Sequence, residues 1–145
     1  MKTPFRIQRL GPGDKEKACM VAEIHKSLRP SREYMAEFLA NPRNYLIVAY
    51  VGEEPTGFIL GYELQRVDRR NPMMFLYEIG TSENHRRKGI GRALVSELDR
   101  ICRERKFMKM YVFTDEANVA AMGLYQATGG KRSLPDNVLF GWRYD

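Results

Sequence analysis

Residues 73–92 read MMFLYEIGTSENHRRKGIGR, and this stretch decides how the rest of the chain is interpreted. Its first nine residues, Met73–Thr81, are mostly apolar and predict a β-strand that carries one acid, Glu78. Its last residues open a helix, which we expect to run over Gly89–Arg105. That helix is indicated by apolar side chains at helical spacing, namely Ile90, Leu94, Leu98 and Ile101. The stretch is therefore a strand, a basic loop and the start of a helix.

The loop from His85 to Arg92 has the chemistry of a phosphate-binding site. The first backbone N–H groups of a helix have no partner within the helix, and the helix dipole adds partial positive charge there. Gly89 and Gly91 have no side chain to keep a phosphate away from these N–H groups. We therefore expect the loop to bind a pyrophosphate, although a solvated basic turn has the same composition. The pattern fits neither the Walker motif nor the dinucleotide fingerprint.

The segments on either side predict a domain of the α/β (α+β) class with a mixed sheet. Further strands are expected at Phe5–Leu10, Tyr45–Val51, Thr56–Leu64, Lys109–Thr114 and Val138–Tyr144. Further helices are expected after the capping residues Asp14 and Ser31 and over Asn118–Thr128. Since no repeat or linker interrupts this order, we expect a single domain over residues 1–145.

The composition excludes several other classes of protein. The chain has 145 residues, 43% of them apolar, a net charge of +6 and two cysteines, Cys19 and Cys102. Its longest apolar run, Tyr45–Val51, is too short to cross a bilayer, and the first ten residues lack the apolar stretch of a signal peptide. Two cysteines make no disulfide framework. We therefore expect a cytoplasmic globular protein, without a membrane partner, that binds an anionic ligand or a nucleic acid.

Two motifs resemble those of the GCN5-related N-acetyltransferases (GNAT). Arg86-Arg87-Lys88-Gly89-Ile90-Gly91 resembles the acyl-CoA pyrophosphate loop of that family. Asn118-x-x-Ala121-x-x-Leu124-Tyr125-x-x-x-Gly129-Gly130 is similar to its other signature helix, except that an aromatic residue is more usual at Gly130. The resemblance implies one N-acetyltransferase domain over residues 1–145, with a mixed sheet of six or seven strands flanked by four helices. It also implies acetyl-CoA as the co-substrate.

The resemblance assigns the acetyl-CoA contacts to particular residues. Backbone groups of Ile79–Thr81 are expected to hold the pantetheine arm, and the Ile79 N–H to face the thioester oxygen. The loop is expected to hold the pyrophosphate, and Asn118 to hydrogen-bond the pantetheine, although Asn118 also suits a helix cap. The full set is Ile79, Gly80, Thr81, Arg86, Arg87, Lys88, Gly89, Ile90, Gly91, Arg92 and Asn118.

Two residues are candidates for proton transfer. Glu78 is the candidate general base, because it is the only acid in the apolar strand that leads into the loop; an outward-facing strand carboxylate is the alternative. Tyr125 matches the family's general acid toward the leaving sulfur, with core packing as the alternative. Asp115 and Glu116 are second candidates for the base or for contacts with the substrate. The alternative is that they form the polar first turn of the next helix. Neither cysteine is expected to be a nucleophile, so acetyl transfer should be direct.

The acceptor is less clearly indicated. Tyr77-Glu78-Ile79 and Phe113-Thr114-Asp115-Glu116 resemble the aminoglycoside 3-N-acetyltransferase branch, which confers antibiotic resistance. This favours a small-molecule amine, with Tyr34 in the acceptor wall and Glu23, Glu33, Glu37 and Glu78 supplying negative charge. The alternatives are a protein N-terminus or lysine and, outside the enzymes, a nucleic-acid-binding module, which we do not favour. We expect no metal site. A homodimer is compatible with the sequence, which does not decide between a monomer and a dimer.

Overall fold

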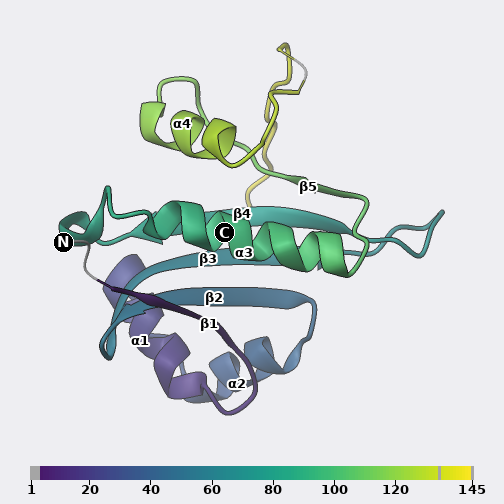
Figure 1. Ribbon diagram of the computed structural model, residues 1–145. Helices are drawn as coiled ribbons and strands as arrows, with labels where there is room; N and C mark the ends of the chain where they lie inside the picture. Colours follow the sequence, from purple (N-terminus) through teal and green to yellow (C-terminus); the bar gives the residue numbers. More distant parts are fainter. Residues whose placement is uncertain (1–3, 134, 145) are drawn as a thin grey trace.

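The computed structural model describes residues 4–133 and 135–144, which form a sheet with helices on both faces (Figure 1). The strands are β1 (Arg6–Leu10), β2 (Asn44–Val51), β3 (Glu54–Leu64), β4 (Met73–Thr81) and β5 (Lys109–Tyr111). The helices are α1 (Lys15–Lys26), α2 (Arg32–Ala40), α3 (Ile90–Glu104) and α4 (Val119–Ala127), with a short 3₁₀ turn, η1 (Glu83–His85). The expected class and the four expected helices are confirmed.

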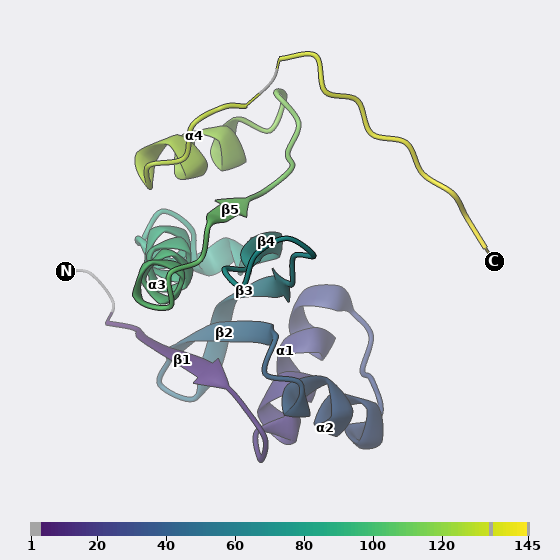
Figure 2. The same cartoon turned by 90° about the vertical axis from the view of Figure 1, so that its right-hand side faces the viewer.

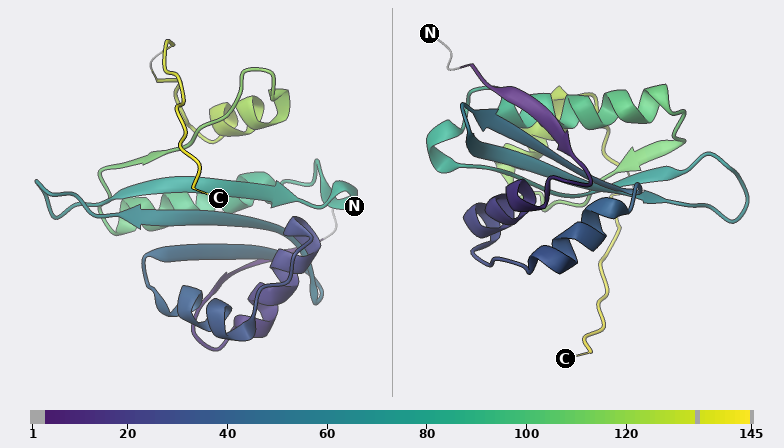
Figure 3. Two further views of the ribbon diagram at one scale, coloured as in Figure 1. Left: turned by 180° about the vertical axis from the view of Figure 1, so that it is seen from behind. Right: turned by 90° about the horizontal axis from the view of Figure 1, so that it is seen from below.

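The sheet has the order β1-β2-β3-β4-β5 (Figure 3). Neighbours from β1 to β4 are antiparallel, whereas β4 and β5 are parallel. A parallel pair needs a crossover connection, and α3 supplies it. The basic loop consequently lies where β4 ends and α3 begins.

Two apolar cores hold the helices to the sheet. On one face α3 packs through Leu94 and Leu98, both fully buried, against Ile47 and Ile59 of the sheet. On the other face α1 and α2 pack through residues such as Cys19 against the outward side of β2 and β3. Figure 2 shows α1 and α2 on one side of the sheet, and α3 and α4 on the other. A side chain of β4 therefore belongs to one core or the other according to the face on which it lies.

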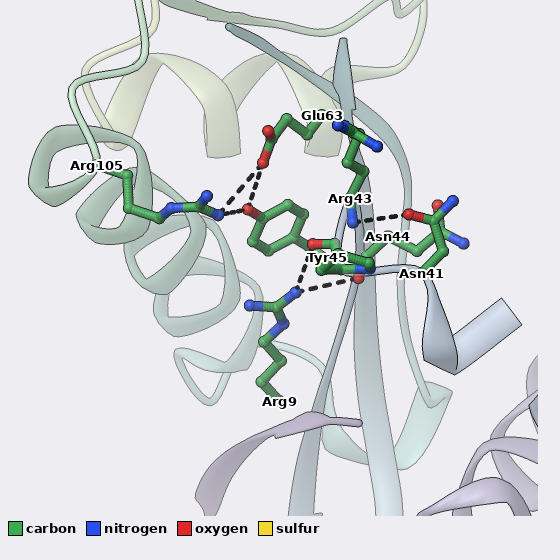
Figure 4. A network of polar contacts seen from close by, with 8 residues as sticks. Arg9, Asn41, Arg43, Asn44, Tyr45, Glu63 and Arg105 are labelled. Carbon is green, nitrogen blue, oxygen red and sulfur yellow. Dashed lines mark hydrogen bonds and ion pairs between the residues drawn. The ribbon is translucent and has the colours of Figure 1, made fainter. Parts of the chain in front are cut away.

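A polar network around Tyr45 ties the sheet to the end of α3 (Figure 4). The Tyr45 ring is fully buried, and its hydroxyl donates to Glu63 Oε1 at 2.7 Å. Arg105, just after α3, contacts the Tyr45 hydroxyl and Glu63 Oε1, while the Arg9 guanidinium lies 3.9 Å from the centre of the Tyr45 ring. Three strands and the end of one helix are thereby joined at the end of the sheet remote from the basic loop.

The sheet has five strands in the described part of the chain, where six or seven were expected. Residues 138–144, expected as a strand, run extended without strand pairing and away from the rest of the molecule (Figure 2). Their five large apolar side chains are each at least 75% exposed. An apolar, β-branched and aromatic pattern favours a strand only where a neighbouring strand accepts its hydrogen bonds, and this segment has none here.

Candidate active site

A β-bulge in β4 decides the direction in which Glu78 points. The register between β3 and β4 shifts at Tyr77, which is one residue more than β3 can match. Before the bulge Leu76 lies in the α3 core, and after it Ile79 packs on that same core. Glu78 is thereby placed on the α1 and α2 face, where simple alternation from Leu76 would have buried it under α3.

Glu78 has a charged partner there. Its carboxylate forms an ion pair with the ammonium of Lys26, at the C-terminal end of α1. The Glu78 side chain is 28% exposed, so this is a half-buried ion pair at the edge of a cavity. The sequence predicted an acid among apolar neighbours. It carried no sign of Lys26, which is 52 residues away along the chain.

Two adjoining cavities meet at Glu78. The inner one, of about 120 Å³, lies between α1, α2 and the sheet, and its wall includes Val21, Met35, Leu60 and the predicted Tyr34. The outer one, of about 460 Å³, follows the end of β4 from Glu78 through Ile79–Thr81 to Arg86. Both cavities are lined by His25, Lys26, Phe58 and Glu78. Glu78 and four of the predicted acetyl-CoA contacts thus share one space.

His25 is a site residue that the sequence analysis did not single out. It lies on α1 with its ring centre 5.0 Å from that of Phe58, and its Nε2 is buried without a hydrogen-bond partner. Burial lowers the pKa of His25, so the imidazole is neutral at pH 7. A neutral imidazole has one ring nitrogen without a proton, and that nitrogen can accept one. Only the packing of α1 on β3 reveals this, because a lone histidine on a helix carries no motif.

β4 and β5 diverge toward the end of β4 that leads into the basic loop. The two strands pair only over Met73–Phe75 and Lys109–Tyr111, and they separate beyond those residues. The edge of β4 over Ile79–Thr81 therefore presents backbone groups that β5 does not use. Such an edge hydrogen-bonds an extended amide-containing chain in the way that a strand would.

The basic loop has the conformation of an anion-binding turn. Gly89 has φ of +85° and is the N-cap of α3, without any side-chain cap on the helix. Arg87 has φ of +62°, so the loop bends twice before the helix begins. The Ile90 side chain is buried in the α3 core, so only its backbone N–H can serve a ligand. The uncapped N–H groups from Gly89 to Arg92 fit a pyrophosphate.

A second observation supports a ligand beside this loop. The Nδ1 atom of His85, in the turn just before Arg86, is buried without a hydrogen-bond partner. Arg86 lies between the outer cavity and the loop, with its Nε donating to the Thr81 carbonyl at 3.4 Å. The residues present thus fit a long ligand that is anionic at one end, as acetyl-CoA is.

The two signature residues of α4 have structural roles as well. Asn118 caps the helix through its side-chain oxygen, which accepts from the Ala121 N–H at 3.1 Å. The cap leaves the amide nitrogen of Asn118 as a donor. Tyr125 packs on the α3 core, and burial raises the pKa of Tyr125, so its hydroxyl stays protonated.

Several predicted residues do not reach the cavities. Asp115 and Glu116 lie exposed in the loop before α4, where Glu116 pairs with Arg132, and neither lines the cavities described above. Of the four acids expected to gather, only Glu78 lines them; Glu23 instead pairs with Arg29 at 2.6 Å. Glu23 is therefore held by a partner that the sequence does not reveal, and Glu33 and Glu37 of α2 line neither cavity.

The remaining reactive groups are accounted for. Both cysteines are buried, and burial raises the pKa of Cys102 to about 11, so its thiol is a poor nucleophile at neutral pH. No three His, Cys, Asp or Glu side chains among residues 4–133 and 135–144 gather in a metal-binding arrangement. In the same part of the chain, no helix combines the length and the apolar character needed to cross a membrane.

Comparison with known proteins identifies the family. The family model described as the acetyltransferase (GNAT) family matches residues 16–129. The chain belongs to this family, and it is an acyltransferase enzyme. No protein in the set of curated sequences matches it significantly.

Several solved structures share the fold. An aminoglycoside acetyltransferase from an uncultured soil metagenomic sample, in complex with sisomicin, is 22% identical, with a TM-score of 0.85 and 97% of each chain covered. The aminoglycoside N-acetyltransferase AAC(6')-Iy, with a bisubstrate analogue of CoA, is 18% identical, with a TM-score of 0.77 over 98% of this chain and 99% of that one. A ribosomal-protein-alanine N-acetyltransferase from Brucella melitensis biovar Abortus 2308 is 20% identical, with a TM-score of 0.74, covering 97% and 100%. At these identities the likeness shows the fold.

Proposed function

We propose that this protein transfers the acetyl group of acetyl-CoA directly to a primary amine of a small molecule. One observation carries the proposal: the outer cavity, lined by Ile79–Thr81 and Arg86, and the inner cavity, beneath α1 and α2, meet at Glu78. A carboxylate at the junction of a cofactor site and an acceptor site can take a proton from the attacking amine. We also propose that the enzyme is a single domain and that it acts in the cytoplasm. We propose no nucleic-acid partner, because binding of CoA accounts for the basic loop.

The chain's own residues bind the co-substrate in three places. The loop from Arg86 to Arg92 holds the pyrophosphate, through the N–H groups at the start of α3 and the basic side chains. The open edge of β4 over Ile79–Thr81 hydrogen-bonds the pantetheine arm, with the amide nitrogen of Asn118 as a further donor. Acetyl-CoA, when bound, supplies an acetyl group activated as a thioester. The Ile79 N–H then faces the thioester oxygen and stabilises negative charge on it.

We assign the two proton transfers of the reaction to residues on opposite faces of the sheet. The amine gives a proton to Glu78, on the α1 face, and becomes able to attack; the Nε2 of His25, in the same cavity, is a second acceptor. Tyr125, on the α4 side, keeps its proton at neutral pH and donates it to the departing sulfur. β4 and β5 separate beyond Phe75 and Tyr111, and we place the thioester in this opening, between the two proton-transfer groups.

Two observations support the choice of acceptor: the ligands of similar solved structures, and the residues that line the inner cavity. Aminoglycosides are the ligands named for two of the similar structures, and acetylation of the 3-amino group, with the antibiotic resistance that follows, is the form that the sequence motifs favour. The inner cavity of this chain is apolar, and Lys26 already neutralises Glu78. A polycation therefore fits at the mouth of the cavity, whereas an amine with an apolar body fits its interior.

The test is a thiol-release assay with acetyl-CoA and a panel of acceptors. The panel contains aminoglycosides, polyamines, phenylalkyl amines, amino acids and peptides with free N-termini. We expect CoA release that depends on a small-molecule amine, with an acetylated product of the corresponding mass. If only peptides or ribosomal proteins are acetylated, the small-molecule assignment is wrong. If calorimetry detects no binding of acetyl-CoA, the acetyltransferase mechanism itself is wrong.

A further inference from the structure

Two opposite charges lie together at the junction of the inner and outer cavities. The Lys26 ammonium contacts the Glu78 carboxylate, and both side chains line both cavities. In the part of the chain that the structure describes, these two are the charged side chains of the inner cavity's wall, beside the titratable His25. Lys26 is 53% exposed, so its ammonium is free to turn toward a ligand. The junction thus offers one cation and one anion side by side.

This ion pair bears on which amine can enter. A ligand that is only a cation binds Glu78 by displacing Lys26, and it leaves the Lys26 ammonium without its partner. A ligand that also carries a carboxylate gives Lys26 a new partner, so all four charges stay paired. Charges at a half-buried site are costly unless each of them is paired. The junction therefore favours a ligand that carries both an ammonium group and a carboxylate.

The spacing of the two protein charges limits the spacing of the two charges in the ligand. Because Lys26 and Glu78 are in direct contact, the ligand's carboxylate and ammonium group must also be close neighbours. An α-amino acid carries both groups on one carbon atom. His25 supplies a further contact, since its buried Nε2 has no hydrogen-bond partner. An ammonium group has three N–H donors, of which Glu78 and His25 Nε2 can accept two.

The rest of the inner cavity suits an apolar side chain. Its wall consists mostly of apolar residues, such as Val21, Met35 and Leu60, and its volume is about 120 Å³. An apolar cavity of about 150 Å³ in another protein is large enough to hold benzene. The inner cavity therefore has room for a side chain of about the size of that of leucine or methionine.

We propose that the acceptor is a free α-amino acid with an apolar side chain. The proposal rests on the proposed function and names the class of amine that the enzyme acetylates. The carboxylate of the amino acid pairs with Lys26, and its ammonium group binds Glu78 and His25. Its side chain enters the inner cavity. Lys26 is accordingly a residue that determines specificity, because it selects acceptors that carry a carboxylate next to the amine.

The reaction is then the N-acetylation of that amino acid. The ammonium group gives a proton to Glu78, and the free nitrogen bonds to the thioester carbon as the carbon–sulfur bond breaks. Two protons leave the nitrogen in all: one is matched by the proton that the sulfur of CoA receives through Tyr125, and the other passes to water. The product keeps its carboxylate but has no ammonium group, so Glu78 no longer holds it.

The first test compares acceptors that share one apolar body. L-Leucine, leucinamide and isoamylamine have the same side chain, but only leucine has a carboxylate; leucinamide also represents a peptide N-terminus. We expect kcat/KM for leucine to exceed that for each of the other two by about 10- to 100-fold, the effect of one hydrogen bond to a charged group. Leucinamide is the stricter comparison, because its amine loses a proton more easily. A value for leucinamide that equals or exceeds that for leucine would overturn the proposal.

The second test varies the side chain of the amino acid and needs no variant of the protein. From alanine to leucine we expect kcat/KM to rise by at least about tenfold, because the added carbon atoms fill the inner cavity. For tryptophan we expect it to fall, because the indole exceeds the volume of that cavity. Values that do not depend on the side chain would contradict the proposal.

A matched pair of variants tests Lys26 itself. Lys26→Met removes the charge and keeps the length of the side chain, whereas Lys17, on the same helix, contacts Gln8 and lines neither cavity. We expect the ratio of kcat/KM for leucine to that for isoamylamine to fall by about 10- to 100-fold in Lys26→Met, mainly through a higher KM for leucine. The ratio should be unchanged in Lys17→Met. Comparing one ratio between proteins cancels the different basicities of the two amines. An unchanged ratio in a folded Lys26→Met protein, or a lowered one in Lys17→Met, contradicts the proposal.

Direct binding separates failure of this inference from failure of the proposed function. Calorimetry of the unmodified protein, with and without CoA, should show tighter binding of leucine than of leucinamide or isoamylamine, and this result decides if Lys26→Met does not fold. If other amines are acetylated while leucine neither reacts nor binds, the proposed function stands and this inference is wrong. If leucine binds but acetyl-CoA does not, the amino-acid site stands and the proposed function is wrong. If neither binds, both are wrong.

Discussion

The carboxylate of Glu78 faces both Lys26 and the space that an acceptor amine would enter. Because Lys26 is half exposed, the ion pair contributes at most about 1 kcal/mol to stability. The ion pair matters more for substrate binding than for stability, because an incoming ammonium group must compete with Lys26 for the Glu78 carboxylate. A small amine that can lose its proton there is a better partner than a fixed cation.

We predict that Glu78→Gln lowers the turnover rate by about 10²–10⁴-fold near neutral pH, because the amide cannot accept the proton of the amine. Part of the loss should be recovered above about pH 9, where more of the amine is already neutral. The measurement is kcat against pH, with the binding of acetyl-CoA followed separately. Glu53→Gln, in the exposed turn between β2 and β3, is the matched control. A parent-like rate at every pH would leave His25 or water as the base.

A second prediction concerns His25 and stability. Its folded-state pKa lies below that of an unfolded histidine, because burial disfavours the charged ring. Near pH 7 and above, both states are neutral at this residue and it carries no pH-dependent penalty. As the pH falls below about 6.5, the unfolded state takes up the proton first, and the folded state loses stability.

The measurement for His25 is the midpoint of thermal unfolding between pH 5 and 8. The His25→Gln variant should lose less stability than the parent when the pH falls from 7 to 5, with the two curves parallel above pH 7. Equal losses on acidification would show that His25 is hydrated in solution.

At the scale of elements, the turn from β4 into α3 does most to shape the site. Its glycines have different tasks: Gly89 needs a positive φ, whereas Gly91 has an ordinary helical conformation and keeps the helix start accessible. A Cβ on Gly91 would lie 3.4 Å from Leu124 Cδ2, close to ordinary contact, so the fold can tolerate a side chain there.

We therefore predict that Gly91→Glu folds normally and weakens acetyl-CoA binding by at least about 100-fold, or roughly 2.7 kcal/mol. An acidic residue in the first helical turn favours the helix, but it repels the phosphates and blocks the N–H groups. Calorimetry with CoA gives the affinity, and thermal unfolding gives the stability. Gly123→Glu, in α4 where a Cβ meets open space, is the control. Normal CoA binding by a folded Gly91→Glu protein would remove the pyrophosphate from this loop.

The elements were predictable where one segment carried its own pattern. β4 has the expected bounds, Met73–Thr81, and α3 differs from its expected range by one residue at each end, because both are long and strongly patterned. Three features were not predictable: the bulge at Tyr77, the Lys26 partner of Glu78 and the buried Nε2 of His25. Each depends on a contact between segments far apart in sequence. The expected last strand lacks a neighbour for a related reason, since no segment can pair by itself.

At the scale of the whole molecule, the net charge of +6 bears on how an anionic co-substrate approaches. We predict that KM for acetyl-CoA rises several-fold between about 0.05 and 0.5 M salt, with kcat nearly unchanged, because screening weakens long-range attraction. Steady-state kinetics at fixed acceptor concentration measure this effect. A KM that is independent of salt would mean that short-range contacts alone hold the phosphates.

The bulge at Tyr77 has a consequence for comparing this enzyme with its relatives. Straightening the strand with Tyr77 in place would turn Glu78 into the apolar core beneath α3 and leave the cavity without its carboxylate. Deleting Tyr77 would instead remove the bulge and keep Glu78, then directly after Leu76, on the α1 and α2 face. An alignment that pairs strands residue by residue, without a gap at this point, matches Glu78 to a side chain on the opposite face. Relatives therefore need to be aligned by the face of the sheet on which each β4 side chain lies. In a chain without the bulge, an acid two residues after the equivalent of Leu76 lies on the α3 face and has no equivalent role.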